Sequence, residues 1–159
     1  MTIVLIILHV LAAVLFIGPT TVAVSTFQGQ ALKAHAGDTR AAGTAALLHR
    51  ITRSYGVLSI LVPLLGVATM ATNWSVYATR ANFHTAIAVA VIAWALLLVL
   101  IIPQQRKMMG ALGLLEADEH DPEEDVVSDW DRARSRLSMF GGVFALLWVV
   151  MLALMYINF

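Results

Sequence analysis

The sequence predicts an all-α integral membrane protein with four transmembrane helices in a single domain. Of its 159 residues, 60% are apolar and 13% are charged, against about 45–50% and about 25% in soluble domains. The charges are also segregated, because long uncharged stretches separate them. Each stretch can supply the roughly 20 residues that a helix needs to cross about 30 Å of hydrocarbon. These stretches are residues 1–32, 54–79, 81–105 and 137–159.

Other fold classes fit these stretches less well. Nothing alternates with period two, and four lone strands cannot close a membrane barrel. A soluble helical core would need polar faces, which the uncharged stretches lack. The first stretch has no basic residue before it and is longer than the apolar region of a signal peptide, so we expect it to be retained. The absence of cysteine excludes disulfides, iron–sulfur ligation and thiolate chemistry.

Turn-forming residues divide the chain into four spans. We expect the spans at residues 2–27, 51–72, 82–103 and 138–158. Gly37 is a plausible end for an extended first helix, and Asp38 can cap a new helical turn over residues 41–49. Residues 104–115 extend the third helix, and residues 129–137 lead into the fourth.

Prolines are expected to kink two of the spans, because a proline has no backbone N–H to donate. Gly18-Pro19 lies in the first span and Pro63 in the second. In a membrane the freed carbonyls need other donors, and Thr20 and Thr21 are placed to supply them. Gly141 and Gly142 should allow another helix to approach the fourth span closely.

The basic residues predict the orientation. The first loop and its edges hold Lys33, Arg40, Arg50 and Arg53, and the third holds Arg106, Lys107, Arg132, Arg134 and Arg136. The short second loop has only Arg80, and the two tails have no basic residue. Cytoplasmic loops carry the excess of Lys and Arg. We therefore expect two long cytoplasmic loops, both termini outside, and a multi-pass protein of a bacterial cytoplasmic membrane.

An acidic segment lies in the third loop, between residues 104 and 137. Nine of the ten Asp and Glu residues fall within residues 116–131. Such a run can be a solvated surface, or it can dock a basic partner by electrostatic steering. The candidate docking residues are Glu116, Asp118, Glu119, Asp121, Glu123, Glu124 and Asp125.

Histidines are the polar residues of greatest interest. His9 and His84 should both lie in the outer half of the bilayer, where an ionisable residue is a functional candidate. They could ligate haem iron, bind a metal or relay protons. They could equally hydrogen-bond between helices as structural glue. His49 lies at the cytoplasmic boundary beside Arg50, while His35 and His120 should be solvated in the loops.

Helix one carries a local resemblance. Residues Leu8-His9-Val10-Leu11-Ala12, followed by Phe16 and Gly18, resemble the first helix of copper-resistance protein D-like domains and of membrane protoporphyrinogen oxidase. In that oxidase the helix-one histidine is associated with haem, so the resemblance implies haem at His9. Phe16 stands where the family usually has Trp, and we find no basic catalytic residue in a later span.

The whole-chain layout is similar to uncharacterised actinobacterial four-helix membrane proteins. Some of these are accessory subunits of the respiratory supercomplex of cytochrome bc and cytochrome c oxidase. No phosphate-binding loop, Ser-His-Asp set or zinc-binding helix motif occurs in the sequence. We therefore expect a non-catalytic accessory subunit without cofactor, metal or nucleic acid. Its expected partners are lipid and other membrane subunits, and a haem-binding oxidoreductase that uses His9 and His84 is the alternative.

Overall fold

The computed structural model describes residues 2–77 and 79–156, and this part of the chain is helical with no strand. Four helical segments are each long and apolar enough to cross a membrane. The predicted all-α architecture, with four helices of a length and composition suited to a multi-pass membrane protein, is therefore confirmed for the described residues. The segments are Thr2–His35, Thr39–Ala71, Ala81–Ala111 and Trp130–Tyr156. The predicted end of the last span, residue 158, lies outside the described residues.

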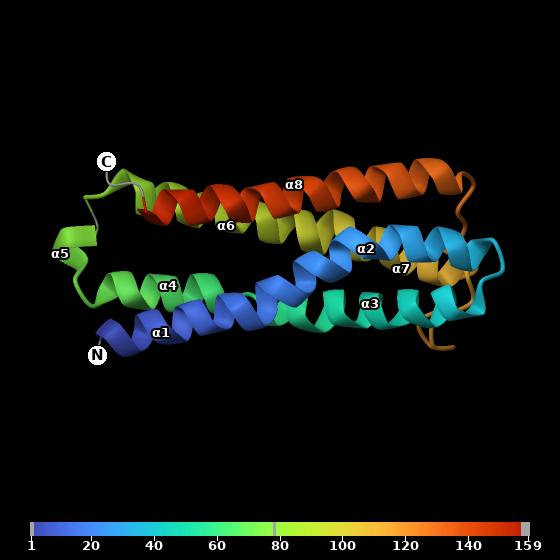
Figure 1. Cartoon of the computed structure of the whole chain (residues 1–159), viewed down its shortest axis with the longest axis horizontal. Helices are drawn as coiled ribbons and strands as arrows, with labels where there is room; N and C mark the ends of the chain where they lie inside the picture. Colours follow the sequence, from blue (N-terminus) through green and yellow to red (C-terminus); the bar gives the residue numbers. More distant parts are fainter. Residues whose placement is uncertain (1, 78, 157–159) are drawn as a thin grey trace.

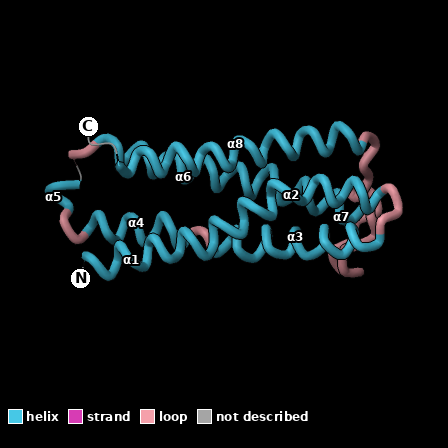
Figure 2. Tube along the Cα trace, viewed as in Figure 1, coloured by secondary structure: helices cyan, strands magenta, loops and turns pink. Residues whose placement is uncertain are grey.

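The four segments run side by side along the long axis of the molecule (Figure 1). The first segment begins, and the last one ends, at the same end of the bundle, which we call the termini end. The first and third loops lie at the opposite end, which we call the loop end (Figure 2). The second loop, at the termini end, contains the single helical turn α5 (Trp74–Tyr77).

Two of the segments contain a π-helical turn shortly before a proline. The first comprises α1 (Thr2–Ala12), η1 (Ala13–Ile17) and α2 (Gly18–His35). The third comprises α6 (Ala81–Ala95), η2 (Leu96–Ile101) and α7 (Ile102–Ala111). A π turn pairs a carbonyl with the amide five residues later. The carbonyl four residues before Pro19 or Pro103 can thus be paired without the N–H that proline lacks.

The second segment is interrupted, as the sequence predicts from Pro63. It comprises α3 (Thr39–Leu58) and α4 (Leu61–Ala71), separated by Ser59 and Ile60. Pro63 cannot donate to the carbonyl four residues before it, and its ring crowds that turn. That carbonyl belongs to Ser59, and it accepts a hydrogen bond from the amide of Val62 instead, at 3.0 Å.

The helices continue past the spans at the loop end. The first segment has 34 residues, which at about 1.5 Å per residue is about 51 Å. As expected, Gly37 ends it with a positive φ of 98°. Asp38 then caps α3 by accepting hydrogen bonds from the amides of Arg40 and Ala41. The helical turn expected over residues 41–49 is thus continuous with α3, which begins at Thr39 rather than at residue 51.

As expected, helix extends into residues 104–137 from both sides, although α7 ends at Ala111 and not near residue 115. Residues 104–111 belong to α7 and residue 130 begins α8 (Trp130–Tyr156), so the connection covers residues 112–129. Gly113, with φ 67°, turns the chain after α7. Asp129 caps α8, because its Oδ1 accepts a hydrogen bond from the amide of Arg132 at 2.8 Å.

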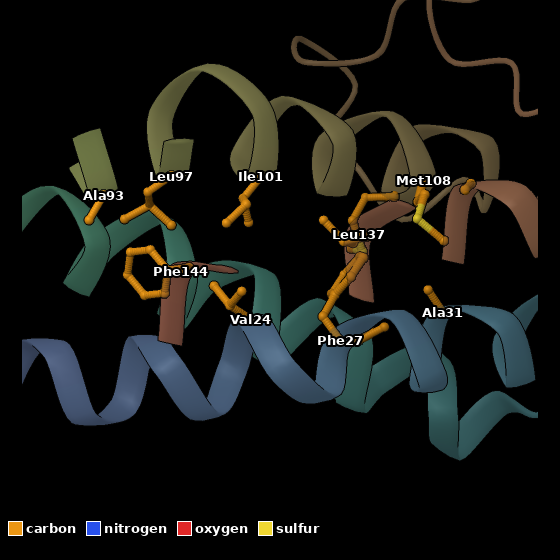
Figure 3. Close-up of a cluster of buried hydrophobic side chains, with 12 residues drawn as sticks. Val24, Phe27, Ala31, Ala93, Leu97, Ile101, Met108, Leu137 and Phe144 are labelled. Carbon is orange, nitrogen blue, oxygen red and sulfur yellow. The ribbon is translucent and has the colours of Figure 1, made fainter. Parts of the chain in front are cut away.

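The packed core lies toward the loop end. There α2 packs on α3 and α8, and α7 packs on α3. Figure 3 shows apolar side chains from α2, α8 and the third segment meeting in this core. Gly141 lets α8 approach α2, since a Cβ there would lie 3.2 Å from Val24 Cγ1. The core includes Val24, Phe27, Ala31, Ala93, Leu97, Ile101, Met108, Leu137 and Phe144.

The termini half is divided differently. There the main packing of α1 is on α4, and that of α6 is on α8. Figure 1 shows these two helix pairs separating toward the termini end. Many apolar side chains of α1 are exposed, including Ile3, Val4, Ile7 and Val10. The bundle therefore consists of one packed half and one half made of two helix pairs.

Candidate functional site

The side chain of His9, on α1, bonds to the backbone of α4. Its Nδ1 lies 2.8 Å from the carbonyl oxygen of Val62. Because a carbonyl only accepts hydrogen bonds, Nδ1 is the donor in this contact, and in the neutral form of the ring the lone pair is then on Nε2. Gly66 makes room for the ring, since a Cβ there would lie 3.1 Å from His9 Cε1. His9 therefore joins α1 to α4, which is the contact expected of an interhelical hydrogen bond.

His84 has a different environment. It is exposed in the first turns of α6, and its Nδ1 lies 3.2 Å from the carbonyl oxygen of Arg80 in the same segment. His9 belongs to the α1–α4 pair and His84 to the α6–α8 pair. Both histidines lie in the termini half, but no hydrogen bond or ring contact described for either one connects them.

Other polar side chains in the spans bond to helix carbonyls. Thr20 donates to Phe16 and Thr21 to Ile17, at 2.7 and 2.8 Å, so both hydroxyls bond to carbonyls that follow the one freed by Pro19, which belongs to Leu15. The break in the second segment leaves the carbonyl of Gly56 without its usual amide. That carbonyl accepts from Ser59 Oγ at 2.6 Å and from Trp94 Nε1 at 3.1 Å. These polar groups therefore stabilise irregular backbone within the bundle.

A cavity of about 270 Å³ with both polar and apolar lining residues lies at the loop end, between α3, α7 and the third loop. His49, Arg50, Arg53, Glu116 and Glu119 are among the residues that line it. His49 is buried, and its Nδ1 lies 3.2 Å from Oε1 of Gln105, which is itself fully buried. We call this space the His49 cavity.

The Arg53–Glu119 ion pair borders the His49 cavity. The Arg53 guanidinium donates a hydrogen bond to the Glu119 carboxylate and lowers the pKa of that carboxyl below its ordinary value. Arg106 adds a second attachment, because its Nη2 donates to the backbone carbonyl of Glu119 at 2.6 Å. The third loop is thus attached to both α3 and α7, and the lowered pKa keeps the Glu119 carboxylate ionised at neutral pH.

The acidic residues of the third loop do not form one uniform surface. Asp125 is buried, with 1% of its side chain exposed, and its Oδ2 accepts from His120 Nδ1 at 2.8 Å. The same oxygen accepts from the amide of Asp121 at 2.9 Å. Glu124 lies 3.6 Å from Arg106. Glu116, Asp118 and Glu123 are exposed.

Three contacts at the loop end could not be predicted from the sequence. His120 is exposed, as expected, and it also bonds to Asp125. His35 was expected to be solvated too, yet its exposed ring stacks on Trp130 with centroids 4.2 Å apart. The Arg53–Glu119 pair joins residues 66 positions apart. Complementary charge was the only available signal, and it does not select a partner among nine acidic residues in one segment.

A second cavity, of about 150 Å³, lies at the loop end between α7, α8 and residues 126–129 of the third loop. Lys107, Arg132 and Arg136 line it, together with Gln104 and Ser128. We call it the basic cavity. Among the described residues, no group of three or more His, Cys, Asp or Glu side chains is placed to hold a metal ion.

Comparisons with known proteins do not assign the chain to a family. No protein-family model, no curated protein and no solved structure matches it closely enough to do so.

Proposed function

We propose that this chain is a non-catalytic accessory subunit of a larger complex in a bacterial cytoplasmic membrane, of the respiratory kind that its overall layout resembles. The observation that carries the proposal is the division of the termini half into two helix pairs. In the most apolar 18-residue stretch of the first segment, only 6% is buried within the chain, against 28% in that of the third segment. Uncovered apolar helices of this kind can pack against the helices of partner subunits.

The proposed orientation has the loop end in the cytoplasm and both termini outside. Nine of the ten Lys and Arg residues belong to the first and third loops or their edges, and Arg80 belongs to the second loop. This asymmetry is typical of proteins that keep their basic loops in the cytoplasm.

The test is purification from native membranes in mild detergent, with mass spectrometry of the chains that co-purify. We expect subunits of a respiratory complex in stoichiometric amounts. Val10, 54% exposed on α1, identifies the face to perturb. Val10→Trp should reduce co-purification, because a bulky side chain disturbs close helix packing. Val149→Trp on α8, at a position that is 62% exposed, is the matched control. Lack of any stoichiometric partner would contradict the proposal.

A haem-binding oxidoreductase is the second candidate, and the geometry of His9 favours it. Histidines that ligate metals usually donate their other ring N–H to a carbonyl or carboxylate, which fixes the ring. His9 makes such a bond to Val62 and keeps Nε2 available. When bound, haem would supply the redox chemistry, while this chain would position the imidazole.

The visible spectrum of the purified chain separates the two candidates. If His9 serves only as a link between helices, His9→Ala should cost about 0.6 kcal/mol of stability, the average for such membrane hydrogen bonds. The variant should then still join its complex. Stoichiometric haem on the isolated chain, lost in His9→Ala, would select the oxidoreductase and contradict the accessory subunit.

A further inference from the structure

We infer that the basic cavity between α7 and α8 binds the phosphate headgroup of an anionic phospholipid. The cavity of about 150 Å³ is lined by Lys107 from α7 and by Arg132 and Arg136 from α8. Gln104 and Ser128 add uncharged hydrogen-bonding groups to the lining. Cationic pockets between transmembrane helices at the membrane boundary are suited to phospholipid headgroups.

Helix geometry makes these cations converge. Arg132 and Arg136 are four residues apart on α8, so they share one face of the helix. Gln104 and Lys107 are three residues apart and share a face of α7. Arg134 lies between the two arginines, on a different face, and does not line the cavity. Only some of the basic side chains at this end of the bundle therefore line the cavity.

The charges of the basic cavity are not balanced within the protein. Its lining has three cations and one carboxylate, Asp129, which leaves a net charge of about two positive units. None of the ion pairs in the described part of the chain uses Lys107, Arg132 or Arg136. The His49 cavity differs, since Arg50 and Arg53 there face Glu116 and Glu119. An anion would therefore bind more favourably in the basic cavity than in the His49 cavity.

The level of the cavity along the helices matches the headgroup region. Arg136 directly precedes the uncharged stretch of the fourth span, and Lys107 closely follows that of the third. Met139 and Val143 continue the face of Arg136 toward the hydrocarbon, at three and seven residues' spacing, and are 56% and 43% exposed. A phosphate in the cavity would thus have apolar surface beneath it for acyl chains. That surface favours a lipid over free phosphate, whichever side of the membrane the loops face.

The experiment measures lipid binding to the full-length chain in detergent by native mass spectrometry and by thermal unfolding. The ligands are phosphatidylglycerol, phosphatidylcholine with the same acyl chains, and inorganic phosphate. We expect one tightly held phosphatidylglycerol that raises the unfolding temperature, and much weaker effects of the other two. Binding equal to that of phosphatidylcholine would overturn the inference. An equal effect of inorganic phosphate would assign the cavity to a soluble phosphate compound instead.

Single substitutions Lys107→Gln, Arg132→Gln and Arg136→Gln test the cavity itself. Each should weaken phosphatidylglycerol binding about fivefold, as expected for one basic charge at an anionic lipid surface. The lipid-free unfolding temperature should not change, because these side chains make no ion pair in the described structure. Arg134→Gln removes the same charge from α8 outside the cavity and should have less than about a twofold effect. An equal loss in Arg134→Gln would show non-specific attraction and overturn the site.

Discussion

At the scale of single residues, Asp125 holds the third loop together through hydrogen bonds to other residues of the same loop. Its carboxylate accepts hydrogen bonds from the His120 ring and from the amide of Asp121. It also lies directly over Gly110, where an added Cβ would stand 2.0 Å from the carboxyl carbon. A buried carboxylate with these partners is costly to displace, because each lost hydrogen bond leaves a charged group desolvated. The third loop therefore depends on Gly110 having no side chain.

Gly110→Ala should detach the third loop from α7. The new methyl group cannot share its space with the short Asp125 side chain, so the carboxylate must leave His120 and Asp121. We expect a loss of more than about 1 kcal/mol in stability, as for a disrupted buried network. Limited proteolysis with an enzyme that cleaves at acidic residues should also be faster in residues 116–125.

Gly43→Ala is the control for that substitution. Gly43 lies within α3 and has no atom within 4 Å of an added Cβ. Alanine there should stabilise the chain by about 0.4–1 kcal/mol, because it restricts the unfolded backbone. Proteolysis of the third loop should not change. If both variants behaved alike, the close contact between Asp125 and Gly110 would not control the loop.

At the scale of elements, the break between α3 and α4 is stabilised by side chains from two segments. The carbonyl of Gly56 has lost the amide that a continuous helix would supply. Ser59 provides a local donor, and Trp94 provides a donor from α6. An unpaired carbonyl would be costly in hydrocarbon, where no water can replace the lost bond. The interrupted helix and the neighbouring segment are therefore coupled through one oxygen atom.

Ser59→Ala and Trp94→Phe test this coupling as a double-mutant cycle. Each single variant leaves one donor on the Gly56 carbonyl, so each should lose only the net value of one hydrogen bond, about 0.5–1.5 kcal/mol. The double variant leaves the carbonyl unpaired and should lose about 1 kcal/mol or more beyond the sum. Reversible unfolding in mixed micelles measures this difference. If the two losses in stability were strictly additive, Ser59 and Trp94 would not be coupled through the Gly56 carbonyl.

Individual elements show how far the sequence determines the fold. The spans, Gly37, Asp38 and the interruption near Pro63 could be predicted, because each depends on composition or on backbone chemistry within a few residues. The π turns could not, since their sequence, Ala13–Ile17 and Leu96–Ile101, is ordinary apolar helix. The partners of His9 and Trp94 depend on which helices are neighbours, and hydropathy does not encode that.

At the scale of the molecule, the ion pairs of the described residues lie at the loop end. The His49 cavity, the basic cavity and the third loop all lie there, whereas the termini half is mostly apolar. The sequence indicated this end through its charges, but it could not separate internally paired residues from available ones. Glu119 and Asp125 bond within the chain, so the surface left for a basic partner is smaller than the acidic segment suggests.

Asp118 and Glu123 are the residues to change when docking is tested. Both are exposed, and no ion pair in the described structure includes them. If a basic partner binds this surface, Asp118→Asn and Glu123→Gln should each weaken co-purification by up to about fivefold, as for exposed charge pairs. The loss should be greater at low salt, where screening is weakest. Asp131→Asn on α8 is the control, and co-purification independent of ionic strength would leave the loop as a solvated surface.

Reporter fusions test the orientation on which the cytoplasmic assignment depends. A reporter that is active only outside should work when fused after Phe159, which lies outside the described residues. A reporter that is active only in the cytoplasm should work when inserted within residues 113–121, between Ala117 and the exposed Asp118. An insertion after Gly37 should give the same result, because both loops lie at one end of the bundle (Figure 2). The physical reason is the excess of Lys and Arg at that end. Opposite activities would place the termini end, with His9 and His84, at the cytoplasmic face and move the acidic loop out of reach of cytoplasmic partners.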